Sequence, residues 1–308
     1  MLIFGGPMLT DLTGADLRAL HVFQTICACG SFAAAERKLD VRQSTISVQI
    51  ANLERRLGFR LCDRGPGGLR LTERGRTLLE ASARLNLAVE SFTQTAAALT
   101  NKTVGTLRLG LMDHLSNTPS FSVSRLLRGF HELAPEVNLQ VVQDIQSVLV
   151  DQILNKSLDM AIGAFPASDA QYDRLPLYKE RQFIHCGPLH PFFKDAPQDY
   201  DAETLEAQRW VRRSYRLDPE AGFPLALGPA AATAANLEAV GVILSALPVL
   251  GYLPSHAAAS FVTRNEIRRV TDNYSVTFEV SLISRAGQRD TAAMRHLRDL
   301  AVQAKKRR

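Results

Sequence analysis

The sequence contains few cysteines and no apolar stretch long enough to cross a membrane. Its 308 residues include four cysteines, and these show none of the spacings that zinc or redox sites use. The most apolar stretch, 240–253, is too short to span a bilayer and is interrupted by Pro248. No basic region precedes the short apolar stretch at the N-terminus, so no signal peptide is predicted. We therefore expect a cytoplasmic protein with reduced thiols, no metal ion and no membrane association.

The common signatures of enzymes are also missing. The chain has no P-loop, no nucleophile elbow, no His-Glu-x-x-His and no dinucleotide-binding glycine fingerprint. His185, His190 and His256 are scattered along the chain, which favours structural or solvent-facing roles for them. The sequence therefore predicts neither a catalytic site nor a cofactor.

The segment 31–57 has the pattern of two short amphipathic helices joined by a tight turn. Apolar residues recur at helical spacing in both parts: Phe32, Ala35 and Leu39, then Ile46, Ile50, Leu53 and Leu57. The opposite face of the second helix carries small and amide side chains, among them Gln43 and Ser44. Such side chains allow close backbone approach and hydrogen bonds to base edges. The segment predicts a helix-turn-helix whose recognition helix lies near 42–55.

Basic residues are concentrated around this segment. Residues 31–76 contain ten lysines and arginines against five acidic residues, an excess equal to the formal net charge of +5 of the whole chain. A basic helix-turn-helix is the electrostatic signature of phosphate binding, whereas two amphipathic helices alone occur in many folds. The charge therefore favours DNA binding over an ordinary helical hairpin.

A glycine-rich turn follows the second helix. Two short extended segments are separated by Gly65, Pro66, Gly67 and Gly68. This pattern predicts the hairpin wing of a winged helix-turn-helix. Arginines flank the tip and suit phosphate or minor-groove contact, although a plain solvated hairpin would have the same pattern. The residues predicted to contact DNA are Ser31, Lys38, Arg42, Gln43, Ser44, Thr45, Ser47, Val48, Gln49, Arg64 and Arg70.

A long helix is predicted from Thr72 to about Thr100. Apolar residues recur every seven positions in it, and others follow four positions later, which is the a/d pattern of a coiled coil. An ordinary core helix is the alternative, but the stripe is narrow and favours dimerisation. The predicted dimer contacts are Leu78, Leu85, Val89, Phe92 and Leu99. A two-fold dimer would place two recognition helices on successive turns of DNA and read a pseudo-palindromic site.

From Gly105 onward, strands alternate with helices, which predicts βαβ units and a mainly parallel sheet. Strands are expected at 105–111, 138–143, 159–165, 183–186, 210–213 and 276–284, and helices at 120–133, 148–155 and 289–304. The length of this part suits two subdomains. The predicted division is a mainly α DNA-binding domain at 12–71, a linker helix at 72–101 and an α/β effector domain at 105–308. In that domain, subdomain I covers about 105–166 and 268–308, and subdomain II covers about 167–267.

The run from Asp16 to Thr77 resembles the DNA-binding region of LysR-type transcriptional regulators. The matching segments are LRALHVFQTICACGSFAAAERKL, VRQSTISVQIANLERRLGFRLCDR and LTERG. Three positions depart from the family pattern. Arg42 replaces the serine usual at the N-cap of the recognition helix, and we expect it to recover stability through a DNA contact. Val48 stands where arginine is frequent, and Cys62 replaces a common phenylalanine.

The second part of the chain resembles the effector domain of the same family, which is similar to type II periplasmic-binding proteins. The matching segments are GTLRLGL, APEVNLQV, LDMAIGAF and HCGPLHPFF. The resemblance implies a small-molecule effector held between the subdomains and linker helices that pair two subunits antiparallel. It also implies a homotetramer, formed as a dimer of dimers, that bends promoter DNA, with RNA polymerase as a further candidate partner.

Loops at strand ends and helix N-termini are the expected ligand contacts in such a fold. The predicted effector-binding residues are Met112, Asp113, His114 and Asn117 after the first strand, Gln146 and Ser147 in the loop after the second, and Thr233 and Asn236 at a helix start across the site. Each could instead cap its own helix. Two other functions stay open: a ligand-independent architectural DNA-binding protein, and a solute-binding receptor, which would need export and no DNA-binding domain.

Overall fold

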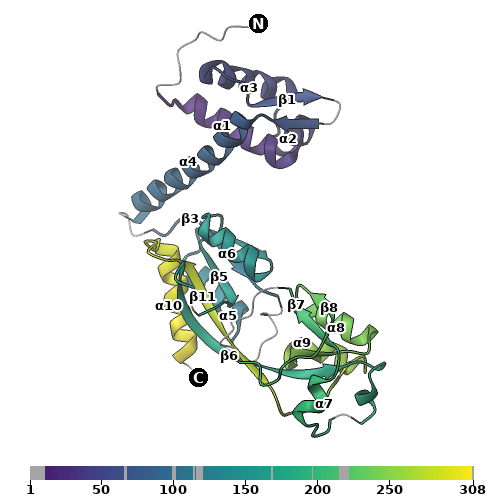
Figure 1. Cartoon of the computed structure of the whole chain (residues 1–308). Helices are drawn as coiled ribbons and strands as arrows, with labels where there is room; N and C mark the ends of the chain where they lie inside the picture. Colours follow the sequence, from purple (N-terminus) through teal and green to yellow (C-terminus); the bar gives the residue numbers. More distant parts are fainter. Residues whose placement is uncertain are drawn as a thin grey trace. The chain divides into compact units, whose positions relative to one another are not determined.

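The structure is a computed structural model that describes residues 11–65, 68–98, 102–113, 115, 121–167, 169–195, 197–214 and 222–306. The chain forms two compact units, Met1–Thr93 and Gln94–Arg308 (Figure 1). The first unit contains α1 (Gly14–Cys29), α2 (Phe32–Leu39), α3 (Gln43–Leu57), β1 (Cys62–Gly65), β2 (Gly68–Leu71) and most of α4 (Glu73–Ala98). Within the described residues, no helix combines the length and hydropathy that a membrane span requires.

The first unit is held together by the apolar stripes that the sequence predicts. Phe23 and Ile26 of α1 and Ile46 of α3 are fully buried in one core with α2 and the start of the wing. Gly30 and Gly58 end α1 and α3 at φ values of 69° and 78°, a left-handed conformation that glycine adopts without steric cost. The helix-turn-helix and its wing are therefore the observed local structure.

Helix α4 packs against the first unit over part of its length. Leu78 and Leu85 lie against the core of the helix-turn-helix, and the buried Ser82 hydroxyl accepts a 2.9 Å hydrogen bond from Gln24 of α1. Leu78 and Leu85 are thus partly buried within their own chain, and their place in a dimer seam stays a prediction.

Later positions of the same heptad pattern are more exposed than Leu78 and Leu85. Val89 is 47% exposed and Phe92 is 74% exposed, so both lie outside the core of their own chain. Leu99 lies outside the described residues. Among the described residues predicted to form the dimer, Val89 and Phe92 are therefore the two that their own chain leaves exposed.

The second unit is an α/β domain built on one nine-stranded sheet. Its strands are β3 (Gly105–Leu111), β4 (Val137–Gln143), β5 (Met160–Ala164), β6 (Tyr172–Cys186), β7 (Trp210–Arg213), β8 (Ala230–Ala234), β9 (Leu250–Pro254), β10 (Arg268–Arg269) and β11 (Val276–Arg285). Its helices are α5 (Val123–Leu133), α6 (Gln146–Leu154), α7 (Ala202–Glu206), α8 (Leu237–Ala246), α9 (Ser255–Thr263) and α10 (Ala292–Lys306), with a 3-10 turn at Pro191–Phe193.

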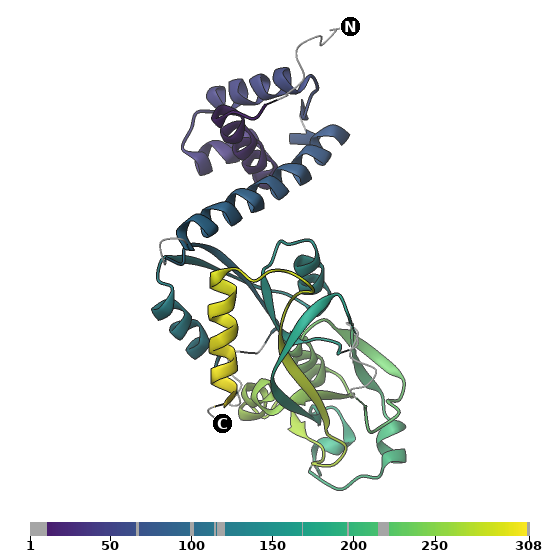
Figure 2. The same cartoon turned by 90° about the vertical axis from the view of Figure 1, so that its left-hand side faces the viewer.

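The sheet is mixed, which corrects the prediction of a mainly parallel one. The strand order is β4-β3-β5-β11-β6-β9-β7-β8, with β10 paired to β6. The outer strands pair in parallel, but β11 is antiparallel to both β5 and β6, and β6 is antiparallel to β9. The long strands β6 and β11 run between two subdomains, as Figures 1 and 2 show. The chain passes from subdomain I to subdomain II along one of these strands and returns along the other. The two strands therefore run in opposite directions.

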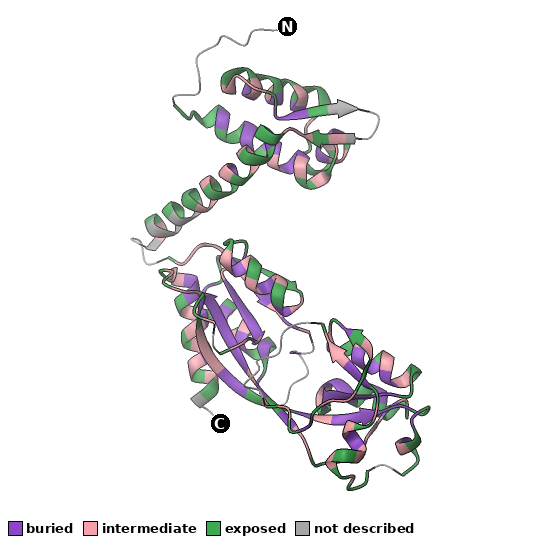
Figure 3. Cartoon of the chain, in the orientation of Figure 1, coloured by how far each residue is buried: buried purple, intermediate pink, exposed green. Residues whose placement is uncertain are grey.

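Each subdomain has its own core. In subdomain I, α5 and α10 pack together, and Phe130 of α5 and Leu297 of α10 are buried with the strands β3 and β5. Subdomain II has a core around Trp210 and Leu250 on one side of the sheet and another around Val211 and α8 on the other. Figure 3 shows the buried residues concentrated on the strands. This arrangement fixes the strand ends near which the predicted effector residues lie.

Candidate DNA interface and effector site

Helix α3 divides sharply into a buried and an exposed face. Ile46 and Ile50 are at most 2% exposed, whereas Gln43, Ser44 and Thr45 are exposed. Val48 lies on the same free face and is 59% exposed. The side chains that the sequence assigns to base contact therefore lie on the solvent side of the recognition helix.

The N-terminus of α3 is capped by a side chain that the sequence reasoning missed. Arg42 is the N-cap residue and makes no side-chain capping hydrogen bond. Instead, the Glu36 carboxylate of α2 accepts a 3.3 Å hydrogen bond from the backbone N–H of Gln43. Glu36 thus supplies the hydrogen-bond acceptor that the Arg42 side chain does not provide. No sequence pattern indicated this contact, because Glu36 lies seven positions before Gln43.

Two predicted DNA contacts already make hydrogen bonds within the chain, and a third is half-buried. Ser31 is the N-cap of α2, and its hydroxyl accepts a 3.1 Å hydrogen bond from the N–H of Ala34. The Ser47 hydroxyl donates to the carbonyl of Gln43 at 2.7 Å. Gln49 is half-buried, and its buried Oε1 has no partner among the described residues.

The wing is a short antiparallel hairpin. Strands β1 and β2 pair with Asp63 opposite Arg70 and Arg64 opposite Leu69. The side chain of Arg70 is exposed, as is that of Lys38 on α2. For Arg64 the backbone position alone is described. Both arginines thus belong to the strands that flank the tip of the wing, as predicted.

The loop after β3 contributes one residue that links the two subdomains. The Asp113 carboxylate accepts a 2.5 Å hydrogen bond from the backbone N–H of Leu237, the first residue of α8. Met112 is buried, and its sulfur accepts a hydrogen bond from the N–H of Ala164 at 3.2 Å, so it packs in subdomain I. The predicted effector residues His114 and Asn117 lie outside the described residues.

Gln146 and Ser147 begin α6 rather than lying in a loop, which corrects their predicted placement. Gln146 is buried, and its amide donates a 2.6 Å hydrogen bond to the carbonyl of Ala164 at the end of β5. That contact fixes α6 against the sheet. Ser147 is exposed.

Thr233 and Asn236 lie in β8 and just before α8. Thr233 is exposed. Asn236 is the N-cap of α8, and its side-chain oxygen accepts a 2.8 Å hydrogen bond from the N–H of Ala239. Together, Asp113 and Asn236 satisfy two N–H groups of the first turn of α8, one from each subdomain.

Subdomain II also contains a cavity of about 310 Å³ that the sequence analysis did not anticipate. It lies at the ends of β7 and β9, beside α8. Its lining residues are Gln182, Val211, Arg212, Arg213, Phe223, Leu225, Leu227, Val240, Tyr252 and Phe278. Arg212 and Arg213 stand together at the end of the expected strand 210–213, but that pattern alone does not locate the cavity.

A polar chain runs from this cavity into the centre of the sheet. Arg213 donates hydrogen bonds to Gln182 Oε1 at 3.0 Å and to the carbonyl of Tyr252 at 3.2 Å. The Gln182 amide in turn donates to Glu180 at 2.9 Å. Burial raises the pKa of Glu180, although the Gln182 hydrogen bond and the charge of Arg213 oppose that shift. His256 lies 3.5 Å from the same carboxylate.

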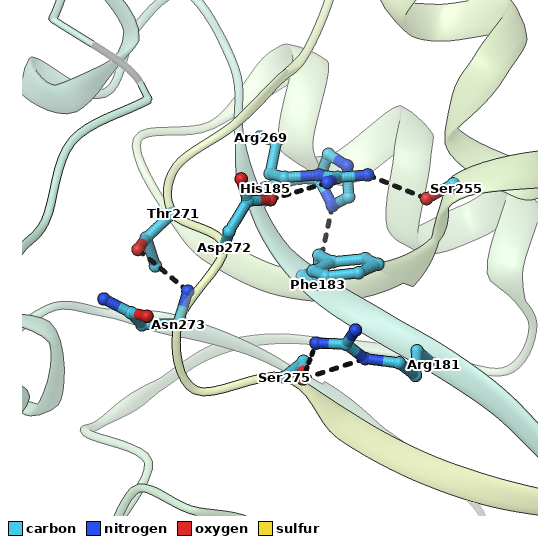
Figure 4. Close-up of polar contacts among 9 residues, drawn as sticks. All are labelled: Arg181, Phe183, His185, Ser255, Arg269, Thr271, Asp272, Asn273 and Ser275. Atoms are coloured by element: carbon cyan, nitrogen blue, oxygen red, sulfur yellow. Dashed lines mark hydrogen bonds and ion pairs between the residues drawn. The ribbon is translucent and has the colours of Figure 1, made fainter.

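Arg181, Phe183 and His185 of β6 belong to a second cluster, in which arginines pack against an aromatic ring (Figure 4). The ring of Phe183 lies between the guanidinium groups of Arg181 and Arg269, whose central carbons are 5.0 and 3.9 Å from the ring centroid. His185 is buried beside them, and its Nδ1 donates a 2.8 Å hydrogen bond to the carbonyl of Phe183. Burial lowers the pKa of His185 to about 4, so the imidazole is neutral at pH 7.

Comparison with known proteins identifies the family. Residues 17–76 match the model of the bacterial regulatory helix-turn-helix protein, lysR family, and residues 100–306 match that of the LysR substrate binding domain. The chain belongs to the LysR family of transcriptional regulators. The family assignment inferred from the sequence is thereby confirmed, as is the expectation of a regulator rather than an enzyme.

Individual LysR-family proteins are similar to this chain over almost its full length. The chain is 30% identical to the HTH-type transcriptional activator BauR of Pseudomonas aeruginosa over 300 residues, which cover 96% of this chain and 98% of that protein. Among solved structures, full-length CbnR complexed with its target DNA matches with a TM-score of 0.64 at 20% identity, covering 94% of this chain and 99% of that one. A full-length OxyR variant from Pseudomonas aeruginosa gives a TM-score of 0.60 at 20% identity, covering 96% and 95%. These similarities support the two-domain fold.

Proposed function

We propose that this LysR-family protein is a sequence-specific, effector-controlled regulator that reads a pseudo-palindromic promoter site. The exposed face of α3 carries the proposal. Gln43 and Ser44 stand on that face near the N-terminal end of the helix, where recognition helices meet base edges. Glutamine suits adenine and serine suits either partner of a base pair.

The basic surface around α3 supplies affinity rather than specificity. Lys38 and Arg42 are exposed beside the turn, and Arg70 is exposed on the wing. Charges in such positions neutralise phosphates and release counterions, so they strengthen binding to any duplex. Base contacts by α3 then select the promoter site.

The proposed dimer forms through the second half of α4. Val89 and Phe92 remain exposed there, and burying an exposed phenylalanine in a helix pair is favourable because apolar area leaves water. A second α4 helix related by a two-fold axis is the proposed partner. Pairing of two dimers into a tetramer and contact with RNA polymerase complete the proposal.

The proposed effector acts between the two subdomains of the second unit. Asp113 and Asn236 meet at the start of α8, one from each subdomain. A ligand that binds one relative position of the subdomains more tightly would shift their equilibrium and thereby the assembly on DNA. Ser147 and Thr233 are exposed polar residues available to such a ligand.

The decisive experiment compares specific and non-specific DNA binding. Sites are first selected from random duplexes with the full chain, and affinities are then measured on a selected site and on a scrambled one. Gln43→Ala and Ser44→Ala should each lower affinity for the selected site by roughly 5- to 100-fold, because a lost base contact costs about 1–3 kcal/mol. Their effect on the scrambled site should be small.

Arg70→Ala is the matched control, because it removes a phosphate contact from the wing. It should weaken binding to both sites about equally and reduce the salt dependence. Equal losses for all three variants on both duplexes would contradict the assignment of α3 as the recognition helix. Failure to select any common sequence would favour an architectural DNA-binding protein instead.

A further inference from the structure

The cavity in subdomain II exists because two neighbouring strands separate. Strands β7 and β9 run in parallel but pair at a single position, Trp210 with Leu250, within these described strands. Further along, the carbonyl of Tyr252 accepts a hydrogen bond from the Arg213 side chain. The gap therefore opens toward the carboxyl ends of two parallel strands, which is where ligands bind in open α/β sheets.

Most of the cavity wall is apolar. Phe223, Tyr252 and Phe278 contribute aromatic rings, and Val211 and Val240 contribute aliphatic groups from β7 and α8. Phe223 contacts both other rings edge-on, with centroid distances of 5.3 and 6.2 Å. A volume of about 310 Å³ is at the small end of ligand sites, which span roughly 300–1,000 Å³. The cavity fits a compact molecule with an apolar body.

One charged side chain in this wall has no counter-ion among the residues that the structure describes. The Nη2 atom of Arg212 donates hydrogen bonds to the carbonyls of Leu227 and Gly228 at 2.5 and 2.7 Å, and these contacts hold the guanidinium in place. Arg212 is half-buried. No carboxylate within the described part of the chain forms an ion pair with it, and its Nε and Nη1 make no hydrogen bond there.

A partly buried guanidinium without a counter-ion carries a desolvation cost that a bound anion would offset. Arginine is suited to this role because its planar group can donate two parallel hydrogen bonds to a carboxylate. Arg213 differs, because it already bridges Gln182 and Tyr252 across the separated strands. The chemistry of the cavity thus combines one available cation with an aromatic wall.

We propose that this cavity binds a small organic anion with an apolar, preferably aromatic, body, and that Arg212 pairs with its carboxylate. This ligand site is separate from the effector site proposed between the subdomains, and the inference rests on the proposed function for its regulatory consequence. The ring of the ligand would pack against Phe223 and Phe278. Val240 lines the cavity from α8, so occupancy would act on the helix whose N-terminus Asp113 contacts from subdomain I.

The protein contains its own reporter for this site. Trp210 is the single tryptophan in the sequence. Its ring stacks on Tyr252 with a centroid distance of 5.5 Å and an interplanar angle of 20°, and Tyr252 lines the cavity. Excitation of tryptophan alone should therefore report occupancy without a label.

The experiment is a fluorescence titration of the full chain with phenylacetate. Phenylacetamide has the same body without the charge, and acetate has the charge without the body. We expect a saturable signal for phenylacetate and at least tenfold weaker binding of the other two. Concentrations on the order of 10 mM detect a Kd of about 1 mM.

Two substitutions test the role of Arg212. Arg212→Gln should weaken phenylacetate binding at least tenfold, and Arg212→Lys should fall between it and the unchanged protein because it keeps the charge. Arg209→Gln is the matched control, since Arg209 is exposed on the same chain segment and is absent from the cavity wall. Circular dichroism and DNA affinity without ligand verify that each variant is folded.

Several results would overturn the inference. These are no saturable phenylacetate signal in the folded protein, equal binding of phenylacetamide, or unchanged binding in Arg212→Gln. DNA binding, measured in parallel, separates this inference from the proposed function. Sequence-specific DNA binding without any phenylacetate site would defeat the inference alone, whereas a phenylacetate site without sequence-specific DNA binding would defeat the proposed function alone.

Discussion

The Glu36 carboxylate and the backbone N–H of Gln43 form a hydrogen bond of 3.3 Å that joins the two helices of the DNA-binding motif. It fills the place left by Arg42, which provides no side-chain cap for α3. The recognition helix is thus stabilised by its neighbour and leaves the Arg42 side chain exposed to solvent. The cap is thus supplied by Glu36, and Arg42 is left for the DNA contact that we propose for it.

This division predicts opposite effects of two substitutions. Glu36→Ala should destabilise the start of α3 by about 1 kcal/mol, the usual cost of losing a cap. Arg42→Ser should stabilise it by a similar amount, because serine can accept from an N–H further into the helix, yet it should weaken DNA binding. Amide hydrogen exchange along α3 and DNA affinity measure the two effects. A gain in both stability and affinity for Arg42→Ser would contradict the division.

Two helical glycines in the second unit should respond to alanine in opposite ways. A Cβ on Gly241 of α8 would lie 2.4 Å from the ring of Phe261, whereas one on Gly129 of α5 would meet Leu300 at 3.6 Å, an ordinary contact. Gly241→Ala should therefore destabilise the domain by about 1–3 kcal/mol through overpacking. Gly129→Ala should stabilise it by about 0.5–1 kcal/mol, because alanine loses less backbone entropy.

Denaturant unfolding followed by Trp210 fluorescence compares these two variants, since Trp210 lies in the same domain. Phe261→Leu in the Gly241→Ala background should recover part of the loss by making room. Stabilisation by Gly241→Ala would mean that α8 and α9 are less closely packed in solution than in the structure.

The local periodicity of the sequence predicts the helix-turn-helix because both helices bury their apolar stripes within one small unit. The same reasoning does not identify what the apolar face of α4 packs against. A heptad pattern has the same form whether its leucines meet another subunit or the core of their own chain, and Leu78 and Leu85 do the latter. Periodicity identifies the apolar face of a helix but not its partner.

The mixed sheet and the cavity depend on contacts between distant segments. Strand β6 is expected over 183–186 but begins at Tyr172, and Pro176 together with several charged residues obscures its alternation. The cavity arises because β7 and β9 separate after one paired position. No residue pattern within either strand encodes that separation, so Arg212 could be recognised as a site residue once the strands were placed.

Buried His185 should make the second unit less stable in mild acid. Burial lowers its folded-state pKa to about 4, whereas an unfolded histidine has a pKa of about 6.5. Between these values the unfolded state binds more protons, so stability falls as the pH decreases from about 6.5 toward 4. The slope is at most about 1.4 kcal/mol per pH unit for one group.

Unfolding followed by Trp210 fluorescence between pH 7.5 and 5 measures this slope, with phenylacetate absent. His185→Gln should reduce the slope of stability against pH. A smaller slope should remain, because burial also lowers the pKa of His190. An unchanged slope in His185→Gln would show that other groups control the acid sensitivity.

The hydrogen bond between Asp113 and the N–H of Leu237 predicts a site-specific change in hydrogen exchange. Asp113→Ala removes the acceptor from this amide, so its exchange should accelerate about tenfold, which corresponds to about 1.4 kcal/mol and lies within the usual range for a cap. Asp113→Asn keeps an oxygen and should have a smaller effect. Asn236→Ala is the matched control, because it removes the acceptor from Ala239 and should accelerate that amide instead. If Asp113→Ala left Leu237 protected, the carboxylate would be free of α8 in solution and available to contact the effector directly.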